Sequence, residues 1–294
     1  MRLEVQNLVK NFAEKQVLKD VSWTAQSGKA FGLLGRNGAG KTTSIRILMN
    51  VFYPDSGQIL LDGNPIDYEK TKIGYLPEER GLYRKKKIIE QLVYFAQLKG
   101  MSRVKAVEAT DWWLERVGLK DYRNKRLSTL SKGNQQKIQL ITALAHDPQI
   151  IVLDEPFSGL DPVNAQLLKQ IVKEEIQKGK IVFFSSHQMS YIEEFCDSIA
   201  ILHQGKVALT GDLKEIKRAY PRNRLVVHST QNQKIAQEIN LPCELNEEES
   251  LLLTLEQEEQ KTQVIQHLVA NYDIDGINVF EPSLNDIFIQ YTTI

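Results

Sequence analysis

Residues 35–42 read GRNGAGKT, with glycines at positions 35, 38 and 40. Its three glycines permit backbone turns that other residues would block. A backbone turned in this way points successive N–H groups inward, and the helix expected over residues 44–49 adds the positive end of its dipole. The mostly apolar run 29–34 before the loop predicts a strand. Glycines at this spacing between a strand and a helix are typical of a loop that holds phosphate groups.

The last two residues of the stretch carry the chemistry of such a loop. Lys41 can reach the β- and γ-phosphates of a nucleotide, and the Thr42 hydroxyl can ligate Mg²⁺. The alternative is an ordinary glycine-rich turn, which the full spacing and the Lys-Thr pair disfavour. We therefore expect ATP and Mg²⁺ as cofactors, and phosphoryl chemistry. The residues expected to hold the nucleotide here are Gly35, Arg36, Asn37, Gly38, Ala39, Gly40, Lys41, Thr42 and Thr43.

An acidic pair follows a second apolar run. Asp154 and Glu155 come directly after residues 150–153, IIVL, which predict a strand buried on both faces. Open α/β sheets place ligand chemistry at the carboxyl ends of their strands. Asp154 suits a water-mediated contact to Mg²⁺, and Glu155 suits polarising an attacking water. A solvated Asp-Glu turn is the alternative. His187 ends another apolar run, IVFFSSH, where a lone histidine is most often a surface residue.

A second helix start lies about ninety residues after the phosphate loop, at LSKGN, residues 130–134. Ser131 is a natural N-cap, and apolar residues then recur at helical spacing. The free N–H groups of this helix could hold a γ-phosphate, and Gly133 has no side chain to block the approach. If the helix serves a second chain, the nucleotide joins the two chains of a dimer.

The length of 294 residues indicates two domains. Charge is balanced, with 37 basic and 37 acidic residues, which argues weakly against nucleic acid as the main partner. The two cysteines show no metal or disulfide spacing, as expected for a reducing cytosol. No stretch approaches the roughly 20 apolar residues of a membrane-spanning helix. We therefore expect a cytoplasmic protein that meets a membrane, if at all, from outside the bilayer.

The chain is expected to fold as an α/β domain followed by a small α+β domain. Residues 1–220 show the alternation of a P-loop NTPase core, into which a helical lobe of about residues 84–145 is inserted. Residues 221–294 form the second domain. Their pattern of β-α-β-β-α-β resembles a ferredoxin-like fold, and the closing segment predicts a last helix.

With these motifs in order, residues 1–215 resemble the ATP-binding subunit of an ABC transporter. GRNGAGKT resembles the Walker A loop of that family, LSKGN its signature, IIVLDEP its Walker B strand and SGLD its D-loop. The resemblance implies a P-loop fold that hydrolyses ATP in a dimer. It places Ser131 and Gly133 against the nucleotide of the other protomer, His187 at the switch histidine, and Phe12 against adenine.

Two departures from the family pattern matter. The signature has Lys132 and Asn134 in place of Gly and Gln. In GYLPEERGLY, residues 74–83, Glu78 stands where the family usually has a glutamine that contacts Mg²⁺ and the attacking water. A carboxylate can also ligate Mg²⁺, but it donates no hydrogen bond unless it is protonated. The resemblance then implies Glu155, His187 and Glu78 as catalytic residues, and Thr42, Glu78 and Asp154 as metal ligands.

The variant around Glu78 and the ending PSLNDIF, residues 282–288, resemble the bacterial ABC-2 type exporter branch, near the sodium-efflux ATPase subunits. This resemblance implies a membrane permease and a second ATPase chain as partners, at the inner face of the cell membrane. It favours a homodimer, and a heterodimer is the alternative. The basic run Arg84–Lys87 would contact the permease or anionic lipid, or form a solvated loop.

Two other functions compete with the exporter ATPase. A soluble ABC-type ATPase that acts on ribosomes usually carries two ATPase domains, and one that acts on DNA has long inserted coiled coils. This sequence shows neither feature, and we expect no nucleic-acid partner. A regulatory module that binds nucleotide without hydrolysis is disfavoured by Glu155.

Overall fold

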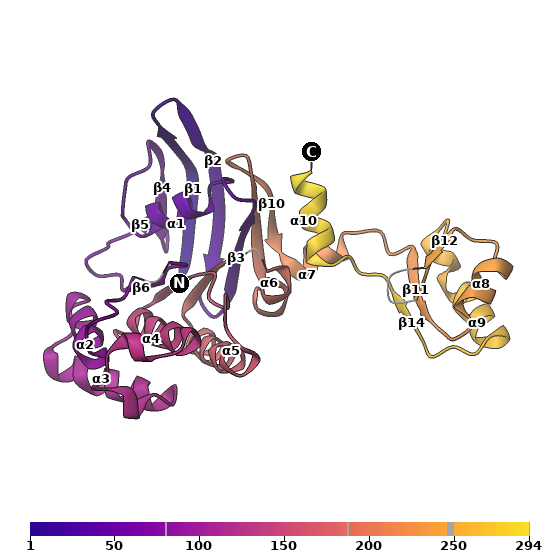
Figure 1. Ribbon diagram of the computed structural model, residues 1–294. Helices are drawn as coiled ribbons and strands as arrows, with labels where there is room; N and C mark the ends of the chain where they lie inside the picture. Colours follow the sequence, from indigo (N-terminus) through magenta and orange to yellow (C-terminus); the bar gives the residue numbers. More distant parts are fainter. Residues whose placement is uncertain (80, 187, 246–249, 294) are drawn as a thin grey trace. The chain divides into compact units, whose positions relative to one another are not determined.

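A computed structural model describes residues 1–79, 81–186, 188–245 and 250–293 (Figure 1). The chain divides into two compact units. The first is Met1–Leu213 together with the chain end from Phe288, and the second is Lys214–Ile287. The first unit ends a few residues before the predicted domain boundary at residue 220, and that boundary stays a prediction. Among the described residues, no helix is long and apolar enough to cross a membrane.

The first unit is built on a six-stranded sheet with the strand order β10-β9-β3-β8-β7-β6. The strands from β9 to β6 are parallel, and β10 pairs antiparallel with β9. The central strands β3, β7 and β8 are buried at every position, which explains their continuous apolar runs. The bounds are β3 Ala30–Gly35, β6 Ile73–Leu76, β7 Ile150–Asp154, β8 Ile181–Ser185, β9 Ser198–His203 and β10 Lys206–Asp212.

An antiparallel sheet with the order β2-β1-β4-β5 forms the other layer of strands in this unit (Figure 1). Its strands are β1 Arg2–Phe12, β2 Lys15–Gln26, β4 Ser56–Leu61 and β5 Asn64–Pro65. Trp23 of β2 joins the two sheets, because its ring lies 4.9 Å from that of Phe31 and 5.2 Å from that of Phe183, measured between centroids.

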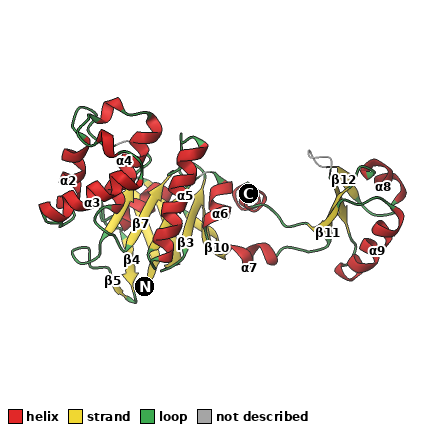
Figure 2. Ribbon diagram, turned by 90° about the horizontal axis from the view of Figure 1, so that it is seen from below, coloured by secondary structure: helices red, strands yellow, loops and turns green. Residues whose placement is uncertain are grey.

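Helices cover the six-stranded sheet and form the predicted lobe (Figure 2). In the lobe, α2 packs on α3, and both contact α4. The helices of the unit are α1 Lys41–Leu48, α2 Ile88–Leu98, α3 Arg103–Arg116, α4 Lys132–Leu144, α5 Pro162–Gln177 and α6 Met189–Phe195. Short 3₁₀ turns lie at η1 Lys120–Tyr122 and η2 Leu127–Thr129.

The second unit contains an antiparallel sheet with the order β12-β13-β11-β14. Together with its helices it gives the order β-α-β-β-α-β that the sequence predicts, and this strand order and pairing are those of a ferredoxin-like fold. The bounds are β11 Arg224–His228, α8 Asn232–Glu238, β12 Cys243–Leu245, β13 Leu251–Thr254, η3 Glu258–Gln260, α9 Lys261–Asn271 and β14 Gly276–Val279. Helix α7 is Leu213–Arg218, and the last helix, α10, is Leu284–Thr292.

Candidate functional site

The phosphate loop, residues 35–42, connects β3 to α1 as predicted. Gly38 and Gly40 have φ angles of 81° and 110°, a region that residues with a side chain rarely adopt. A Cβ atom at Gly40 would lie 2.6 Å from Cδ2 of Leu18, so a side chain does not fit there. Strand β2 therefore packs closely against the backbone of the loop at Gly40.

The side chain of Lys41 folds back over the loop. Its Nζ donates a hydrogen bond of 2.6 Å to the carbonyl oxygen of Gly35. Burial lowers the pKa of Lys41, and the carboxylates of Glu155, Asp154 and Glu78 partly offset that shift. The three acidic residues that the sequence predicts for the site therefore all interact electrostatically with one half-buried cation at the start of α1.

The acidic pair lies at the carboxyl end of β7, beside β8. Asp154 pairs in register with Ser185, and the backbone N–H of Glu155 donates to the Ser185 carbonyl oxygen at 2.8 Å. Both carboxyl groups are buried. Burial raises the pKa of Asp154, Glu78 and Glu155 raise it further, and a hydrogen bond from the Ser185 side chain opposes the shift. The pair is a desolvated acidic site, not a solvated turn.

Two side chains that the sequence analysis missed contact this pair. The Ser186 hydroxyl donates a hydrogen bond of 2.9 Å to Oε2 of Glu155. Burial, and then the neighbouring Asp154 carboxylate, raise the pKa of Tyr75 to about 12. The only signal in the sequence was position. Tyr75 lies near the carboxyl end of β6 and Ser186 directly follows β8, and both strands neighbour β7. His187 lies outside the described residues.

Helix α4 holds the loop that contains Glu78. Nε2 of Gln139 donates to the carbonyl oxygens of Pro77 and Glu79, at 2.9 and 3.1 Å. Nε2 of Gln136, one turn earlier, donates to the carbonyl oxygen of Pro156 at 3.3 Å. The Glu78 side chain itself is exposed. One helix therefore fixes the backbone on both sides of Glu78 and directly after the acidic pair.

The predicted N-cap of α4 is confirmed, because the Ser131 Oγ accepts a hydrogen bond from the Asn134 N–H at 3.3 Å. The hollow beside Ser131, about 540 Å³, is lined by the helical lobe and by Leu82, and by no residue of the phosphate loop. A Cβ atom at Gly133 would lie 2.9 Å from Nδ2 of Asn164, so packing within the chain also favours a glycine at this position. Figure 1 shows α1 beside the antiparallel sheet and α4 in the helical lobe.

Phe12 ends strand β1, at the turn that leads into β2. Its side chain is 44% exposed, and its ring meets that of Phe52 edge to face at 5.4 Å between centroids. Nζ of Lys10 lies 5.6 Å from the Phe12 ring centroid. The ring is supported by its neighbours and is open enough to stack on a purine base.

The residues that would hold Mg²⁺ suit that ion. Among the described residues there is no group of three or more His, Cys, Asp or Glu side chains able to hold a metal alone. Mg²⁺ in nucleotide sites usually takes only one or two carboxylates and keeps waters and phosphate oxygens as its other ligands. Asp154, Glu78 and the exposed Thr42 hydroxyl supply such a set of oxygen atoms.

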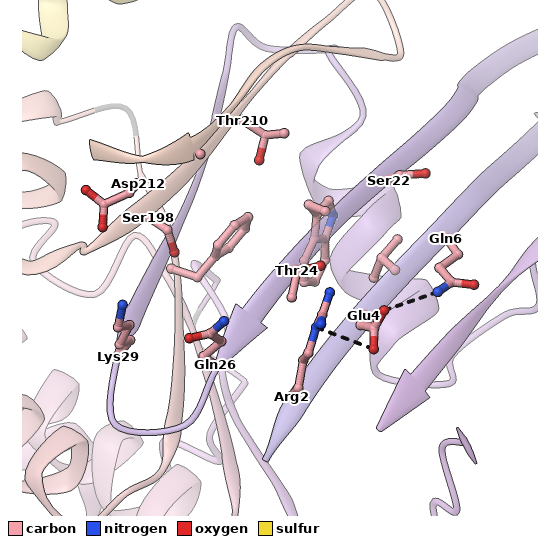
Figure 3. A pocket seen from close by; sticks show the side chains of 14 residues that line it. Arg2, Glu4, Gln6, Ser22, Thr24, Gln26, Lys29, Ser198, Thr210 and Asp212 are labelled. Atoms are coloured by element: carbon pink, nitrogen blue, oxygen red, sulfur yellow. Dashed lines mark hydrogen bonds and ion pairs between the residues drawn. The ribbon is translucent and has the colours of Figure 1, made fainter. Parts of the chain in front are cut away.

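A further hollow, of about 570 Å³, lies between the start of β1, the end of β2 and the end of β10 (Figure 3). Its charged side chains are partly paired with one another. Arg2 forms an ion pair with Glu4 at 3.5 Å, and Gln6 donates to the same carboxylate at 3.2 Å. None of the residues expected to bind the nucleotide lines it.

Comparison with known proteins now gives the family. Residues 18–158 match the ABC transporter family. YhaQ of Bacillus subtilis, an ABC transporter ATP-binding protein, is 41% identical over 290 residues, which are 98% of this chain and 97% of that protein. The chain belongs to the ABC transporter ATP-binding family. Residues 211–292 match the C-terminal domain of the DrrA1-3-like ATP-binding proteins.

More distant relatives agree with this assignment. The ABC transporter ATP-binding protein NatA of Bacillus subtilis is 36% identical over 68% of this chain and 84% of its own. The linearmycin resistance ATP-binding protein LnrL of the same organism is 34% identical over 71% of this chain and 68% of its own. A solved ATP-binding subunit of an ABC transporter, 31% identical, superposes with a TM-score of 0.68 over 74% of this chain and 92% of its own.

These findings confirm the predicted P-loop fold of the ABC type and the predicted enzyme class. The chain is an ATP-binding subunit of an ABC transporter, from a family whose ATP-binding domains hydrolyse ATP.

Proposed function

We propose that this chain is the ATP-hydrolysing subunit of an exporter and that two copies together drive a separate membrane permease. The observation that carries the proposal is the separation of two half-sites. Lys41 and the acidic residues gather at the phosphate loop, whereas the hollow at Ser131 contains no residue of that loop. Two copies arranged head to tail would complete two nucleotide sites, each with the loop of one chain and Ser131 and Gly133 of the other.

Nucleotide binding would use the loop and the turn after β1. The N–H groups of residues 36–43 and the start of α1 present positive charge to the phosphates. Lys41 would exchange its hydrogen bond to the Gly35 carbonyl oxygen for one to a phosphate oxygen. The new bond would be stronger, because it joins the ammonium group to a negatively charged acceptor. The exposed face of Phe12 would stack on adenine.

Hydrolysis would use the carboxylates at the end of β7. Glu155 would accept a proton from the attacking water, and Ser186 fixes the orientation of its carboxylate. Thr42, Asp154 and Glu78 would hold Mg²⁺, which neutralises charge on the phosphates. As a carboxylate, Glu78 can only accept a hydrogen bond from the water. His187 is proposed from the family resemblance alone.

The permease would dock beside the Glu78 loop. A hollow of about 280 Å³ lies there, lined mainly by apolar side chains that include Phe95 and Leu98. Leu98 is 63% exposed, and an exposed apolar side chain at the edge of an apolar hollow suits an apolar helix from a partner. Gln139 lines the same hollow and holds the Glu78 loop, so movement of a docked helix would reach the catalytic side.

Export is supported by the relatives and not by any residue of the ATP site. The match to the DrrA1-3-like C-terminal domain and the similarity to a linearmycin resistance protein favour an exporter at the inner face of the cell membrane. The resemblance to sodium-efflux subunits makes sodium one candidate cargo. The second unit contains none of the expected nucleotide-binding or catalytic residues, and we propose a regulatory or dimer-stabilising role for it.

The test combines the chain with its permease in vesicles and compares Glu155→Gln with the control Glu69→Gln, an exposed residue on another loop. We expect Glu155→Gln to keep ATP binding and to lose turnover by about 10²–10⁴-fold, the usual contribution of a general base. Turnover within about threefold of the unchanged chain would contradict the role of Glu155. A permease that leaves the ATPase rate unchanged would contradict the coupling.

A further inference from the structure

Positive charge is concentrated in the helical lobe. The whole chain has 37 basic and 37 acidic residues, but residues 84–126 contain twelve basic residues against five acidic ones. Two short runs supply half of the basic residues: RKKK at 84–87, and the pair Lys125 and Arg126. Nearly forty residues separate them in the sequence, so the sequence alone does not show whether they act together.

The backbone brings these two runs side by side. The Leu127 N–H donates to the Lys86 carbonyl oxygen at 3.1 Å, and the Ile88 N–H donates to the Lys125 carbonyl oxygen at 3.0 Å. Lys87 and Arg126 form an antiparallel bridge. We call the resulting surface the basic ladder. It consists of Arg84, Lys85, Lys86, Lys87, Lys125 and Arg126, all of which are exposed.

Little within the chain neutralises the ladder. Lys87 forms an ion pair with Glu90 at 3.7 Å, and Nζ of Lys125 lies 4.5 Å from the ring centroid of Tyr122. No ion pair to the other four side chains is found among the described residues. Ile88 and Leu127 are buried directly behind the ladder, so its backbone is anchored while its charged side chains are exposed. Next to it, Tyr83 exposes 58% of its side chain.

We propose that the basic ladder binds the anionic headgroups of the membrane. Six flexible cations, of which only Lys87 has a carboxylate partner among the described residues, suit a layer of phosphates whose positions are not fixed. An adjacent exposed tyrosine suits the interface between headgroups and acyl chains. The ladder lies in the same lobe as the apolar hollow proposed for the permease, but it is a separate surface. The inference extends the proposed membrane location, and it requires no permease.

The test measures binding of the purified full-length chain to vesicles without permease. Vesicles of phosphatidylcholine alone are compared with vesicles in which part of that lipid is replaced by phosphatidylglycerol. The variant K85Q/K86Q removes two charges of the ladder and leaves its backbone hydrogen bonds. The control K29Q/K206Q removes two exposed lysines of the same unit that lie outside the lobe. Binding of a fluorescent ATP analogue verifies that both variants are folded.

We expect binding only to the anionic vesicles, and a loss of about fivefold in affinity for each charge removed, hence roughly 25-fold for K85Q/K86Q. The control should lose much less. Binding should also weaken strongly between about 0.1 and 1 M salt, where the screening length falls from ~10 to ~3 Å.

Three results would overturn the proposal: equal binding to both kinds of vesicle, no binding to either, or equal losses of affinity in the two variants. It would also be overturned if K85Q/K86Q kept its vesicle affinity but lost stimulation by the permease, because the ladder would then serve a protein partner. None of these results bears on hydrolysis by Glu155.

Discussion

The hydroxyl of Ser186 donates a hydrogen bond of 2.9 Å to Oε2 of Glu155, and both side chains are buried. The same hydroxyl accepts a hydrogen bond from the Gln188 N–H at 3.1 Å. Glu155 has a φ angle of 49°, which a residue with a side chain adopts only where its surroundings compensate the strain. Ser186 therefore links the segment after β8 to the carboxylate after β7.

We expect Ser186→Ala to lower turnover by about tenfold and to leave ATP affinity unchanged. A hydrogen bond to a charged group contributes about 1.5–3 kcal/mol, and this one orients the proposed base without touching the phosphate loop. Steady-state ATPase rates and titration with a fluorescent ATP analogue give the two quantities. Ser198→Ala, in strand β9, is the matched control. An equal loss of ATP affinity would show that Ser186 acts through folding of the site.

Glu78→Gln should leave a working ATPase that needs more Mg²⁺. The amide oxygen can still ligate the ion, but the negative charge that attracts Mg²⁺ is lost. The readout is the Mg²⁺ concentration that gives half-maximal ATP binding and half-maximal turnover. Glu79→Gln is the control, because Gln139 holds its backbone oxygen and its side chain is exposed. Complete inactivity of Glu78→Gln would mean that the carboxylate has a further role.

Acid should destabilise the first unit through His146. This side chain is buried beside the Ile73 carbonyl oxygen, and burial, followed by the charge of Lys99, lowers its pKa to about 4. In the unfolded chain the pKa is near 6.5, so below that pH the unfolded state binds more protons. The free energy of unfolding should fall as the pH drops from about 6.5 to 4, by up to ~3 kcal/mol.

Melting temperatures measured between pH 7.5 and 5 check this expectation. His146→Gln can still donate to the Ile73 carbonyl oxygen but does not titrate, so its pH dependence should be flatter. His267→Gln, an exposed change in the second unit, should leave the pH dependence of the first unit as it is. The same slope in His146→Gln and the unchanged chain would exclude His146 as the cause.

The sequence predicted those parts of the fold whose signal is local. The apolar runs at 150–153 and 181–184 are strands because burial on both faces requires continuous apolar residues. The cap at Ser131 was also found, since capping needs only neighbouring residues. The predicted strands did not include β1, β2, β9 and β10. They form two hairpins, and the place of each hairpin in its sheet depends on a distant pairing, of β1 with β4 and of β9 with β3.

The site residues that the sequence did not reveal are those that act through tertiary contacts. Gln139 lies about sixty residues from the Pro77 carbonyl oxygen that it holds, and Ser186 lies about thirty from Glu155. Neither residue belongs to a motif that predicts such a contact. The chain end from Phe288 groups with the first compact unit, and its place in the sequence carries no signal for that grouping.

The proposed exchange of half-sites between two chains needs a pair of variants that each damage one half. Lys41→Ala removes the cation of the phosphate loop and leaves α4 intact. For the other half, Ser131→Asp is suitable, because aspartate also caps a helix and its carboxylate would repel the γ-phosphate. Gly133→Asp is less suitable, since even a Cβ atom there would lie 2.9 Å from Nδ2 of Asn164 in the same chain.

Each variant alone should form only damaged sites. In a mixed dimer, one site would combine the intact loop of the Ser131→Asp chain with the intact Ser131 of the Lys41→Ala chain, and the other site would lack both. ATPase activity should therefore return on mixing, to less than half of that of the unchanged chain, while neither variant alone has appreciable activity. Ser131→Asp should still bind ATP as a monomer, because its own loop is unchanged. If folded Ser131→Asp monomers failed to bind ATP, α4 would act on the nucleotide of its own chain, and the mixed dimer would recover nothing.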